Sequence, residues 1–321
     1  MIINNTYKKH VIKWLNEKKS YVKESTYANY SYIVYNYIIP YVGNYNVKKL
    51  NKKVFQDLIL SLHEKSLSNK TIKDIIMVIK SSLRKVFEEN KIKSFSLKLV
   101  YPKEKNIKIM NVLSKNEQHI LMEYIIKNIS DKNVGILLSL LCGLRIGEVC
   151  ALKWENIDLE NKIIHITKTI QRIYIKENNT ILSKVVITNP KTIKSNRDIP
   201  INDFMYEKLI NLRKNNNVFV LSGNAQYIEP RTYRNYFTKI LKSLNLRHFK
   251  YHALRHTFAS NLISLKIDYK TVSELLGHAN VNITLNLYVH PRLSQKKKCI
   301  DMICKVFQES IWNTFYNVQK L

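Results

Sequence analysis

Residues 142–154 read CGLRIGEVCALKW, and this stretch decides how the second half of the chain folds. The apolar run at 134–142 (VGILLSLLC) predicts a buried helix that ends at Gly143. A second helix is predicted to begin near Gly147, so Arg145 lies in the turn between two buried helices. A guanidinium fixed between two buried helices is unlike an ordinary surface charge, and it indicates a specific role for Arg145.

The size and charge of the chain favour a two-domain protein with a polyanionic partner. Its 321 residues are 45% hydrophobic, which is enough for two domains with cores of their own. Lysine and arginine number 53 against 24 acidic residues, a formal net charge of +29, and nucleic acid is the usual partner of such an excess. Residues 1–105 carry 21 basic and 8 acidic side chains, so both halves are basic, as expected of a clamp that closes on DNA. A genome-wide abundance of lysine explains part of this charge.

Two further features bear on location and redox chemistry. The N-terminus has no apolar signal core, and the longest apolar stretch, near residue 140, is too short to span a bilayer. We therefore expect a cytoplasmic, nucleoid-associated protein without a membrane partner. The cysteines Cys142, Cys150, Cys299 and Cys304 form no CxxC pair, and the first two lie in apolar helical runs. We expect no disulfide, no metal site and no cofactor.

The first 92 residues predict a small all-helical domain. Periodicity and turn signals place helices at 7–18, from Ser25, at 53–63 and at 69–89, with a break at 40–46. Nine tyrosines fall between Tyr7 and Tyr45. Because they lie among lysines, these tyrosines could contact DNA phosphates and sugars. Packing of their rings in a helical core, with the hydroxyl groups exposed to water, fits at least as well.

A linker separates this domain from the second. Residues 94–112 lose the helical period and carry Pro102 and a run of charges. The pattern Ser114-Lys-Asn-Glu117 then predicts a capping box, because the hydroxyl and the carboxylate each satisfy an orphan backbone donor at a helix start. The predicted organisation is a helical domain at 1–95, a linker at 96–112 and a second domain at 113–321.

The pattern changes from helical to alternating at Lys162. The runs KIIHITKTIQRIYI and ILSKVVIT, separated by residues 177–180, predict two or three strands of a hairpin sheet. The stretch at 190–200 (PKTIKSNRDIP) places Lys191 at the tip of this sheet, just before a last short strand. Helical periodicity returns from Asn202. The predicted fold class is therefore mainly α with a small antiparallel β-sheet (α+β). A lysine on a hairpin turn is usually only solvated, so Lys191 by itself indicates no function.

Two stretches further along combine histidine, arginine and tyrosine. In YHALRH, at the head of a helix reaching about residue 265, His252 and Arg255 are three residues apart and project from one helix face. In LLGH, a helix that opens near residue 268 ends with a glycine, and His278 follows directly. Tyr288 comes ten residues later, and its spacing from His278 distinguishes it from the other tyrosines.

These residues together supply what transesterification at a DNA phosphodiester needs without a metal. Two guanidinium groups can hold the non-bridging oxygens, and a phenol becomes a nucleophile once its proton is drawn off. A lysine or histidine must protonate the departing 5′ oxygen. The chain contains no P-loop for ATP and no clustered carboxylates for a two-metal nuclease. The candidate residues are Arg145, Lys191, His252, Arg255, His278 and Tyr288.

Four stretches resemble the motifs of the tyrosine recombinase, or phage integrase, family in the same order. They are CGLRIGEVCALKW, KTIKSNRDIPI, HALRHTFAS and LLGHANVNITLNLY. The resemblance is strong over residues 113–290, and it is looser over the first domain, which resembles the core-binding domain of the family. It implies an N-terminal all-helical core-binding domain followed by a C-terminal catalytic domain.

The resemblance also implies a role for each candidate residue. Arg145 and Arg255 correspond to the arginines that clamp the phosphate, and His252 to the histidine of the HxxR motif. Lys191 corresponds to the general acid on the β-hairpin, and His278 to the second histidine. Tyr288 corresponds to the nucleophile that forms a 3′-phosphotyrosyl bond. Glu148 matches the acidic position that braces the site.

The resemblance further implies an assembly on DNA. We expect a homotetramer that acts on two DNA duplexes with inverted-repeat core sites and passes through a Holliday junction, with a directionality factor or a host DNA-bending protein as a further partner. The tail at 289–321 carries an apolar stripe at helical spacing, formed by Ile300, Ile303, Val306 and Phe307, and we expect it to dock on a neighbouring protomer. Packing on its own domain is the alternative. The helices at 69–89 and 231–242 are predicted to read the DNA.

The implied function is site-specific DNA recombination that integrates or excises a mobile genetic element. A chromosome-dimer resolvase is the first alternative. A type IB topoisomerase-like enzyme would use the same chemistry on one strand, and a DNA-binding regulator would have the fold without catalysis. The regulator would be expected to lack Tyr288 or an arginine, and both arginines and the tyrosine are present.

Overall fold

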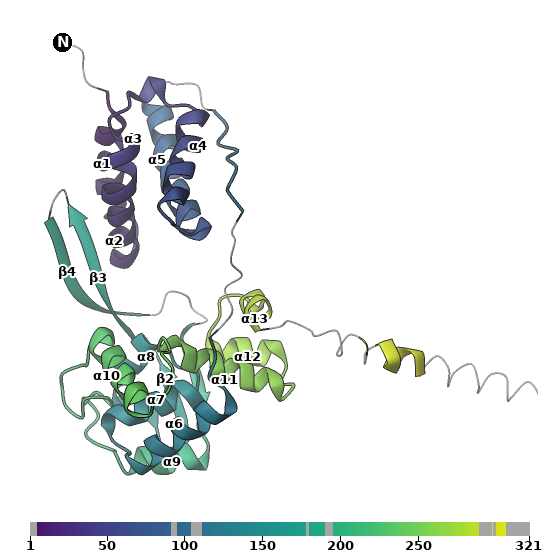
Figure 1. Cartoon of the computed structure of the whole chain (residues 1–321). Coiled ribbons are helices and arrows are strands. Elements are labelled where there is room, and N and C mark those ends of the chain that lie inside the picture. Colours follow the sequence, from purple (N-terminus) through teal and green to yellow (C-terminus); the bar gives the residue numbers. More distant parts are fainter. Residues whose placement is uncertain are drawn as a thin grey trace, which may run out of the picture. The chain divides into compact units, whose positions relative to one another are not determined.

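The computed structural model describes residues 5–90, 95–103, 111–177, 180–189 and 195–288, together with residues 297 and 300–305 of the tail (Figure 1). Only the backbone is described at Asn90 and at 286–288. The chain forms two compact units. Unit 1 comprises Met1–Ile109, Ile170–Thr188 and Glu229–Thr232, and unit 2 comprises the rest.

Unit 1 is built on a helical bundle with an apolar core. Its helices are α1 (Tyr7–Lys18), α2 (Glu24–Ile33), a π-helix (Val34–Ile38), α3 (Ile39–Val42), a 3-10 turn (Val47–Lys49), α4 (Lys52–Glu64) and α5 (Asn69–Asn90). The starts and ends predicted for α1, α4 and α5 are confirmed to within one residue. Phe95 and, from the predicted linker, Leu97 and Leu99 pack against the bundle core. Two of the nine tyrosines, Tyr7 and Tyr27, are buried in that core.

The break predicted to begin at Pro40 is wrong. Pro40 is the second residue of α3 and follows the π-helix by two positions, so it lies inside a continuous helical run. The preceding π-helix widens the turn and carries the chain from α2 into α3 without interruption. The helical run therefore ends only after Val42.

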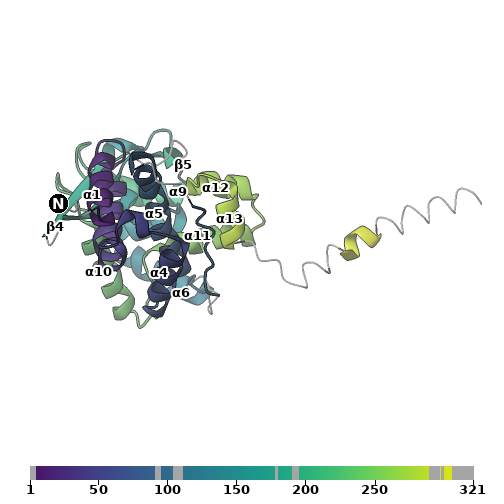
Figure 2. The same ribbon diagram turned by 90° about the horizontal axis from the view of Figure 1, so that it is seen from above.

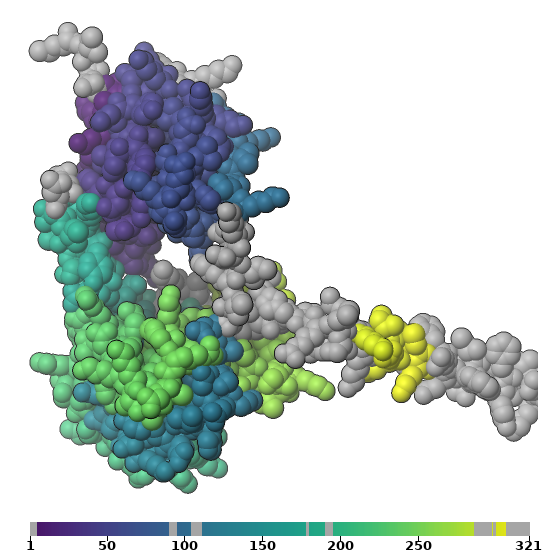
Figure 3. All heavy atoms as spheres, viewed as in Figure 1, coloured from purple at the N-terminus to yellow at the C-terminus, as the bar shows by residue number. Residues whose placement is uncertain are grey.

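A β-hairpin from the second half of the sequence packs on the helices of unit 1. It consists of β3 (Thr169–Glu177) and β4 (Thr180–Thr188). The fully buried hydroxyl of Ser31 donates to the carbonyl oxygen of Lys176 and accepts the N–H of the same residue at 2.9 Å. Lys184 forms an ion pair with Glu24 of α2 at 2.6 Å. Figure 3 shows the teal atoms of the hairpin against the purple atoms of the first helices.

Unit 2 is mainly helical. Its helices are α6 (Lys115–Lys127), α7 (Asp131–Leu141), α8 (Ile146–Ala151), a 3-10 turn (Trp154–Asn156), α9 (Asp203–Ile210), α10 (Pro230–Ser243, from Tyr233 on), α11 (His252–Ser264), α12 (Tyr269–Leu276) and α13 (Val281–Tyr288). The predicted capping box is confirmed, since Ser114 accepts the N–H of Glu117 and the Glu117 carboxylate accepts the N–H of Ser114. Helices α12 and α13 lie side by side in both ribbon views (Figure 1, Figure 2).

A small antiparallel sheet completes unit 2. Its strand order is β1 (Ile157–Asp158), β2 (Ile163–Ile166), β5 (Arg197–Pro200). Ile164 of β2 faces Ile157 of β1 and Ile199 of β5. The predicted strands exist, but the run KIIHITKTIQRIYI contains two strands, β2 and β3, that belong to different sheets. The short last strand predicted after Lys191 is β5, and it pairs with β2 instead of extending the hairpin.

The predicted fold class, mainly α with small antiparallel sheets, is confirmed. Among the helices of the described ranges, none has both the length and the apolar character needed to cross a membrane.

Candidate active site

Arg145 occupies the turn that the sequence predicts. Helix α7 ends at Leu141, Gly143 adopts a left-handed backbone with φ of 68°, and Arg145 is the residue before the first turn of α8. Its backbone N–H donates to the Glu148 carboxylate at 2.9 Å, and its Nη1 donates to the same carboxylate at 2.7 Å. The Arg145 side chain is 33% exposed, so the braced guanidinium still reaches solvent.

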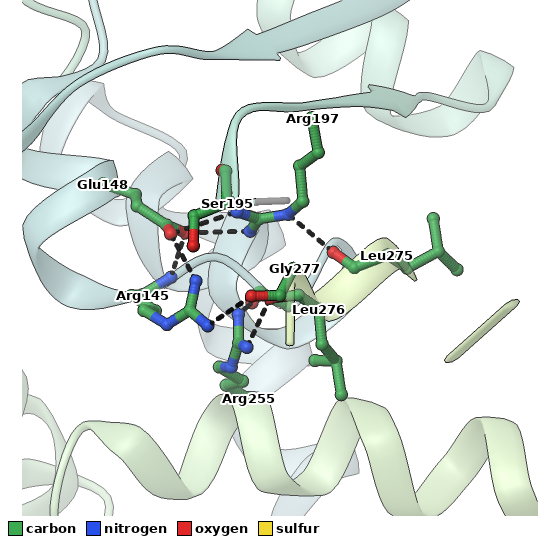
Figure 4. Close-up of polar contacts among 9 residues, drawn as sticks. Arg145, Glu148, Ser195, Arg197, Arg255, Leu275, Leu276 and Gly277 are labelled. Atoms are coloured by element: carbon green, nitrogen blue, oxygen red, sulfur yellow. Dashed lines mark hydrogen bonds and ion pairs between the residues drawn. The ribbon is translucent and has the colours of Figure 1, made fainter. Parts of the chain in front are cut away.

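Arg255 is buried at the centre of the same cluster. Its side chain comes from α11 and the residue is only 1% exposed. Its Nη1 donates to the carbonyl oxygen of Gly143 at 2.8 Å, and its Nη2 donates to that of Leu276. A buried guanidinium without acceptors would cost several kcal/mol, so these carbonyl groups stabilise and orient Arg255 (Figure 4).

The end of α12 supplies further carbonyl acceptors. Gly277 adopts φ of 61°, and the N–H of His278 donates back to Ser273 at 3.0 Å, which closes the helix in the way the sequence predicts. The Gly277 carbonyl oxygen accepts Nη2 of Arg145 at 3.0 Å. The helix end, with its partial negative charge, therefore holds both arginines and positions His278.

Glu148 is the carboxylate shared by the cluster. Its side chain is 3% exposed, and it binds Arg145 and Arg197. Burial acts to raise the pKa of Glu148, but the hydrogen bond and charge of Arg197, together with the charges of Arg145 and Arg255, lower it to about 2. Three guanidinium groups thus surround one ionised carboxylate, which leaves a local excess of positive charge.

Both candidate histidines are neutral at neutral pH. The pKa of His278 is lowered to about 3 by burial and by the charges of Arg255 and Arg145, and its Nδ1 hydrogen-bonds Thr284 Oγ1 of α13 at 2.9 Å. The pKa of His252 is lowered as well, first by loss of surrounding water and then by neighbouring positive charges, although its side chain is exposed on one side. Neutral imidazoles can accept a proton or donate a hydrogen bond.

The structure brings Arg145, His252, Arg255, His278 and Glu148 into one site. Tyr288 is the last residue of α13, one helical turn after Thr284, and only its backbone is described. Lys191 lies outside the described residues.

A pocket of about 650 Å³ opens beside this cluster in unit 2. Arg197, Lys270 and His278 are among the residues that line it, together with Asn196 and Asn280.

Three neighbours of the site have no role that was predicted from the sequence. Arg197 binds Glu148, Thr284 binds His278, and the ring of His256 lies 4.5 Å from that of His252. Alternation along β5, which puts Arg197 on the same side as the buried Ile199, was the signal available for Arg197. No comparable signal marked Thr284.

The cysteines are placed as expected where the structure describes them. Cys142 and Cys150 are buried, and burial raises the pKa of each thiol to about 12. Cys299 lies outside the described residues. Within the described ranges, no group of three or more histidine, cysteine or acidic residues could hold a metal ion.

Two family models match the chain. The model described as "Phage integrase family" matches residues 111–295, and the model described as "Phage integrase, N-terminal SAM-like domain" matches residues 6–63. The first covers unit 2 from the linker to just beyond α13 and includes every candidate catalytic residue.

Two curated relatives cover most of the chain. A "Tyrosine recombinase XerC-like" protein of Caldanaerobacter subterraneus subsp. tengcongensis is 27% identical over 333 residues, with 94% of this chain and 82% of the relative covered. The "ICEBs1 integrase" of Bacillus subtilis is 27% identical over 306 residues, with 88% of this chain and 78% of the relative covered.

A solved structure has the same fold. The Tn1549 transposon integrase in complex with a circular intermediate DNA matches with a TM-score of 0.72 and 21% identity, covering 93% of this chain and 99% of that one. At this identity the match shows the fold alone.

Proposed function

Because the chain belongs to the phage integrase family and is a site-specific tyrosine recombinase, we propose that it cuts and rejoins DNA through a covalent bond between Tyr288 and a 3′ phosphate. The phenolic oxygen attacks phosphorus, the bond to the 5′ oxygen breaks, and the departing oxygen takes a proton. The phosphotyrosyl bond retains the energy of the broken bond, so the strand is rejoined without ATP.

The observation that carries this proposal is the excess of positive charge around Glu148. Arg145 is braced yet reaches solvent, and Arg255 is fixed beside it by backbone carbonyl groups. Such preorganised donors stabilise the charge that develops on the pentacoordinate phosphorus. Arg145 and Arg255 are therefore proposed to clamp the non-bridging oxygens.

His252 and Lys191 are proposed to move the protons, and His278 is proposed to bind the phosphate. His252 is proposed to accept the proton of the phenol: its lowered pKa keeps the ring unprotonated before the step, although it also makes the imidazole a weaker base. His278, held by Thr284, can donate a hydrogen bond to the phosphate from its other ring nitrogen. Lys191 is proposed to protonate the 5′ oxygen, as the resemblance implies.

Two helices are proposed to lie against the DNA. Along α5 the exposed residues Lys70, Lys73, Met77, Lys80 and Arg84 follow one another at helical spacing, which gives the helix one basic face. On α10 the exposed cations are Arg231, Arg234, Lys239 and Lys242. Such faces provide phosphate contacts around base-reading side chains.

Complete recombination requires four cleavages, because two strands are cut in each of two duplexes. One nucleophile for each cut gives a homotetramer, which we propose acts on inverted-repeat core sites and passes through a Holliday junction. The described part of the tail supports docking in trans, since Ile300 and Ile303 are 61% and 55% exposed. Of its predicted apolar stripe, Val306 and Phe307 lie outside the described residues.

The biological role is proposed to be integration or excision of a mobile element, helped by a directionality factor or a host DNA-bending protein, in the cytoplasm at the nucleoid. The similarity to the ICEBs1 integrase supports this reading. A chromosome-dimer resolvase is the second candidate, supported by the XerC-like relative. Recombination of plasmid-borne element ends, compared with recombination of a chromosomal dimer site, separates the two roles.

The chemistry is tested by trapping the intermediate. A nicked suicide substrate that carries the element's own end sequence is incubated with the parent and with Tyr288→Phe, and SDS-resistant protein–DNA adduct is read on a gel. We expect adduct from the parent alone. Tight DNA binding without adduct would favour a regulator, and nicking and closing without strand exchange would favour a topoisomerase-like enzyme.

A further inference from the structure

Arg197 is a buried arginine that none of the proposed catalytic steps uses. It is the first residue of β5, where it faces Ile166 of β2. Its side chain is only 6% exposed, whereas the side chain of Asp198, the next residue, is exposed. The strand therefore directs the Arg197 guanidinium into unit 2 and away from solvent.

The guanidinium of Arg197 joins three separate segments. Its Nη1 and Nη2 donate to the two oxygens of Glu148 at 3.0 and 2.8 Å. Its Nε donates to the carbonyl oxygen of Leu275 at 2.7 Å, and Nη1 also donates to that of Ser195 at 3.3 Å. Figure 4 shows these contacts converging on the Arg197 guanidinium from α8, from the end of α12 and from Ser195, which lies just before β5.

Three consecutive carbonyl groups at the end of α12 each bind a different arginine. The carbonyl oxygens of Leu275, Leu276 and Gly277 accept, in that order, Arg197, Arg255 and Arg145 (Figure 4). These are orphan acceptors at a helix C-terminus, where partial negative charge favours cations. The spacing between the guanidinium groups thus follows from the helix end.

Arg197 also completes the shell around Glu148. Each carboxylate oxygen accepts one hydrogen bond from Arg145 and one from Arg197. A bidentate guanidinium fixes both the position and the plane of a carboxylate. Without this pair of parallel hydrogen bonds from Arg197, here called the fork, the buried carboxylate of Glu148 could rotate. The Arg145 guanidinium that the carboxylate holds would then rotate with it.

Arg197 is poorly placed to hold DNA itself. It uses Nε, Nη1 and Nη2 inside the protein, and it is much less exposed than Arg145, whose side chain is 33% exposed. Its effect on a phosphate would have to pass through other groups.

We propose that Arg197 is a positioning residue for strand cleavage. Through Glu148 it sets the guanidinium of Arg145, and through the carbonyl groups of Leu275 and Ser195 it ties the turn before His278 to the chain that follows Lys191. This inference rests on the proposed function.

The test compares Arg197→Lys with a control variant, Arg213→Lys, at an exposed arginine of unit 2. Arg213 also donates to a backbone carbonyl, that of Trp154, and to a side chain, Asn216, but it has no contact with the cluster. Lysine keeps the charge and loses the fork. We expect Arg197→Lys to bind core-site duplex as the parent does and to cleave it about 10- to 100-fold more slowly, since small misplacements of a clamp cost rates of this order. Arg213→Lys should cleave at the parental rate.

A second substrate separates positioning from general damage. In a methylphosphonate, one non-bridging oxygen is replaced by methyl, so the group is neutral before attack and its transition state carries one negative charge fewer for Arg145 to stabilise. We expect the loss caused by Arg197→Lys to be clearly smaller on this substrate than on the phosphodiester. An equal loss on both would overturn the proposal.

The double variant Glu148→Met, Arg197→Met covers the case in which Arg197→Lys fails to fold. Replacing a buried ion pair by apolar side chains often preserves stability. If either folded variant cleaves at the parental rate, the positioning proposal fails. The proposed function fails separately, if Tyr288→Phe forms as much protein–DNA adduct as the parent does.

Discussion

At the scale of single residues, Thr284 holds the ring of His278 in place. Thr284 is fully buried, and its Oγ1 hydrogen-bonds Nδ1 of His278 at 2.9 Å. We expect Thr284→Val to leave that nitrogen without its partner and to slow adduct formation about 10- to 100-fold through misorientation of the ring, with DNA affinity unchanged. Single-turnover cleavage measures the rate. Thr271→Val, an exposed position on α12, is the control, and parental cleavage by Thr284→Val would show that the hydrogen bond is dispensable.

The pKa of His278 gives a stability prediction with a definite sign. An unfolded histidine titrates near 6.5, whereas the pKa of His278 in the fold is about 3. Between these values the unfolded chain binds the proton and the folded chain does not, so the free energy of unfolding falls as the pH falls. We expect the parent to lose more stability than His278→Gln between about pH 7 and pH 4.5. Urea unfolding at both pH values measures the difference, and equal losses would contradict the half-buried, neutral state of His278.

At this scale the sequence predicts which residue types gather but not which ones brace them. Arg145, His252, Arg255 and His278 stand in helix turns and caps whose local geometry can be read from spacing. Arg197 and Glu148 are 49 residues apart, and their pairing depends on β5 crossing back to β2. Local spacing carries no information on such a pair.

At the scale of elements, the turn between α7 and α8 requires glycine. Gly143 has φ of 68°, and a Cβ there would lie 2.5 Å from Cδ1 of Phe258. We expect Gly143→Ala to lower the free energy of unfolding by about 2–5 kcal/mol, from left-handed strain and overpacking together. Cleavage should fall too, since the Gly143 carbonyl holds Arg255.

Gly223→Ala is the matched control for this turn. Gly223 has nearly the same φ, 66°, but a Cβ there would meet the flexible ends of Asp131 and Lys214. We expect the left-handed strain, about 1–2 kcal/mol, to make up most of the cost, because the Asp131–Lys214 ion pair that the Cβ displaces lies near the surface and contributes little. Chemical unfolding of both variants measures the costs, and equal costs would mean that the Phe258 ring moves aside freely.

The elements themselves were largely predictable, and their pairing was not. Periodicity gave α1, α4 and α5 to within a residue, because amphipathic helices carry their own signal. The docking of the hairpin on α2 depends on Ser31 and Lys176, which are 145 residues apart. The π-helix before Pro40 is equally invisible to periodicity, because it widens the turn by one residue without changing composition.

At the scale of the whole molecule, charge determines how the chain meets DNA. Its net charge of +29 is spread over both parts of the sequence, and the exposed cations of α5 form one face. Binding to duplex DNA should therefore release counterions from many phosphates. For six to ten phosphate contacts, we expect the affinity to fall about 10³- to 10⁵-fold between about 50 and 200 mM salt.

The salt dependence also tests whether the basic face of α5 is used. Replacing Lys73 and Lys80 by glutamine should reduce the slope of log affinity against log salt by about two, one for each lysine that no longer neutralises a phosphate. Lys127→Gln is the control, because Lys127 is exposed and paired with Glu123 at 2.6 Å. Fluorescence anisotropy on core-site and unrelated duplexes gives the slopes. An unchanged slope in the α5 variant would mean that helices other than α5 make the phosphate contacts. If the affinity of the parent did not depend on salt, the excess of lysine would reflect only a bias of amino-acid composition.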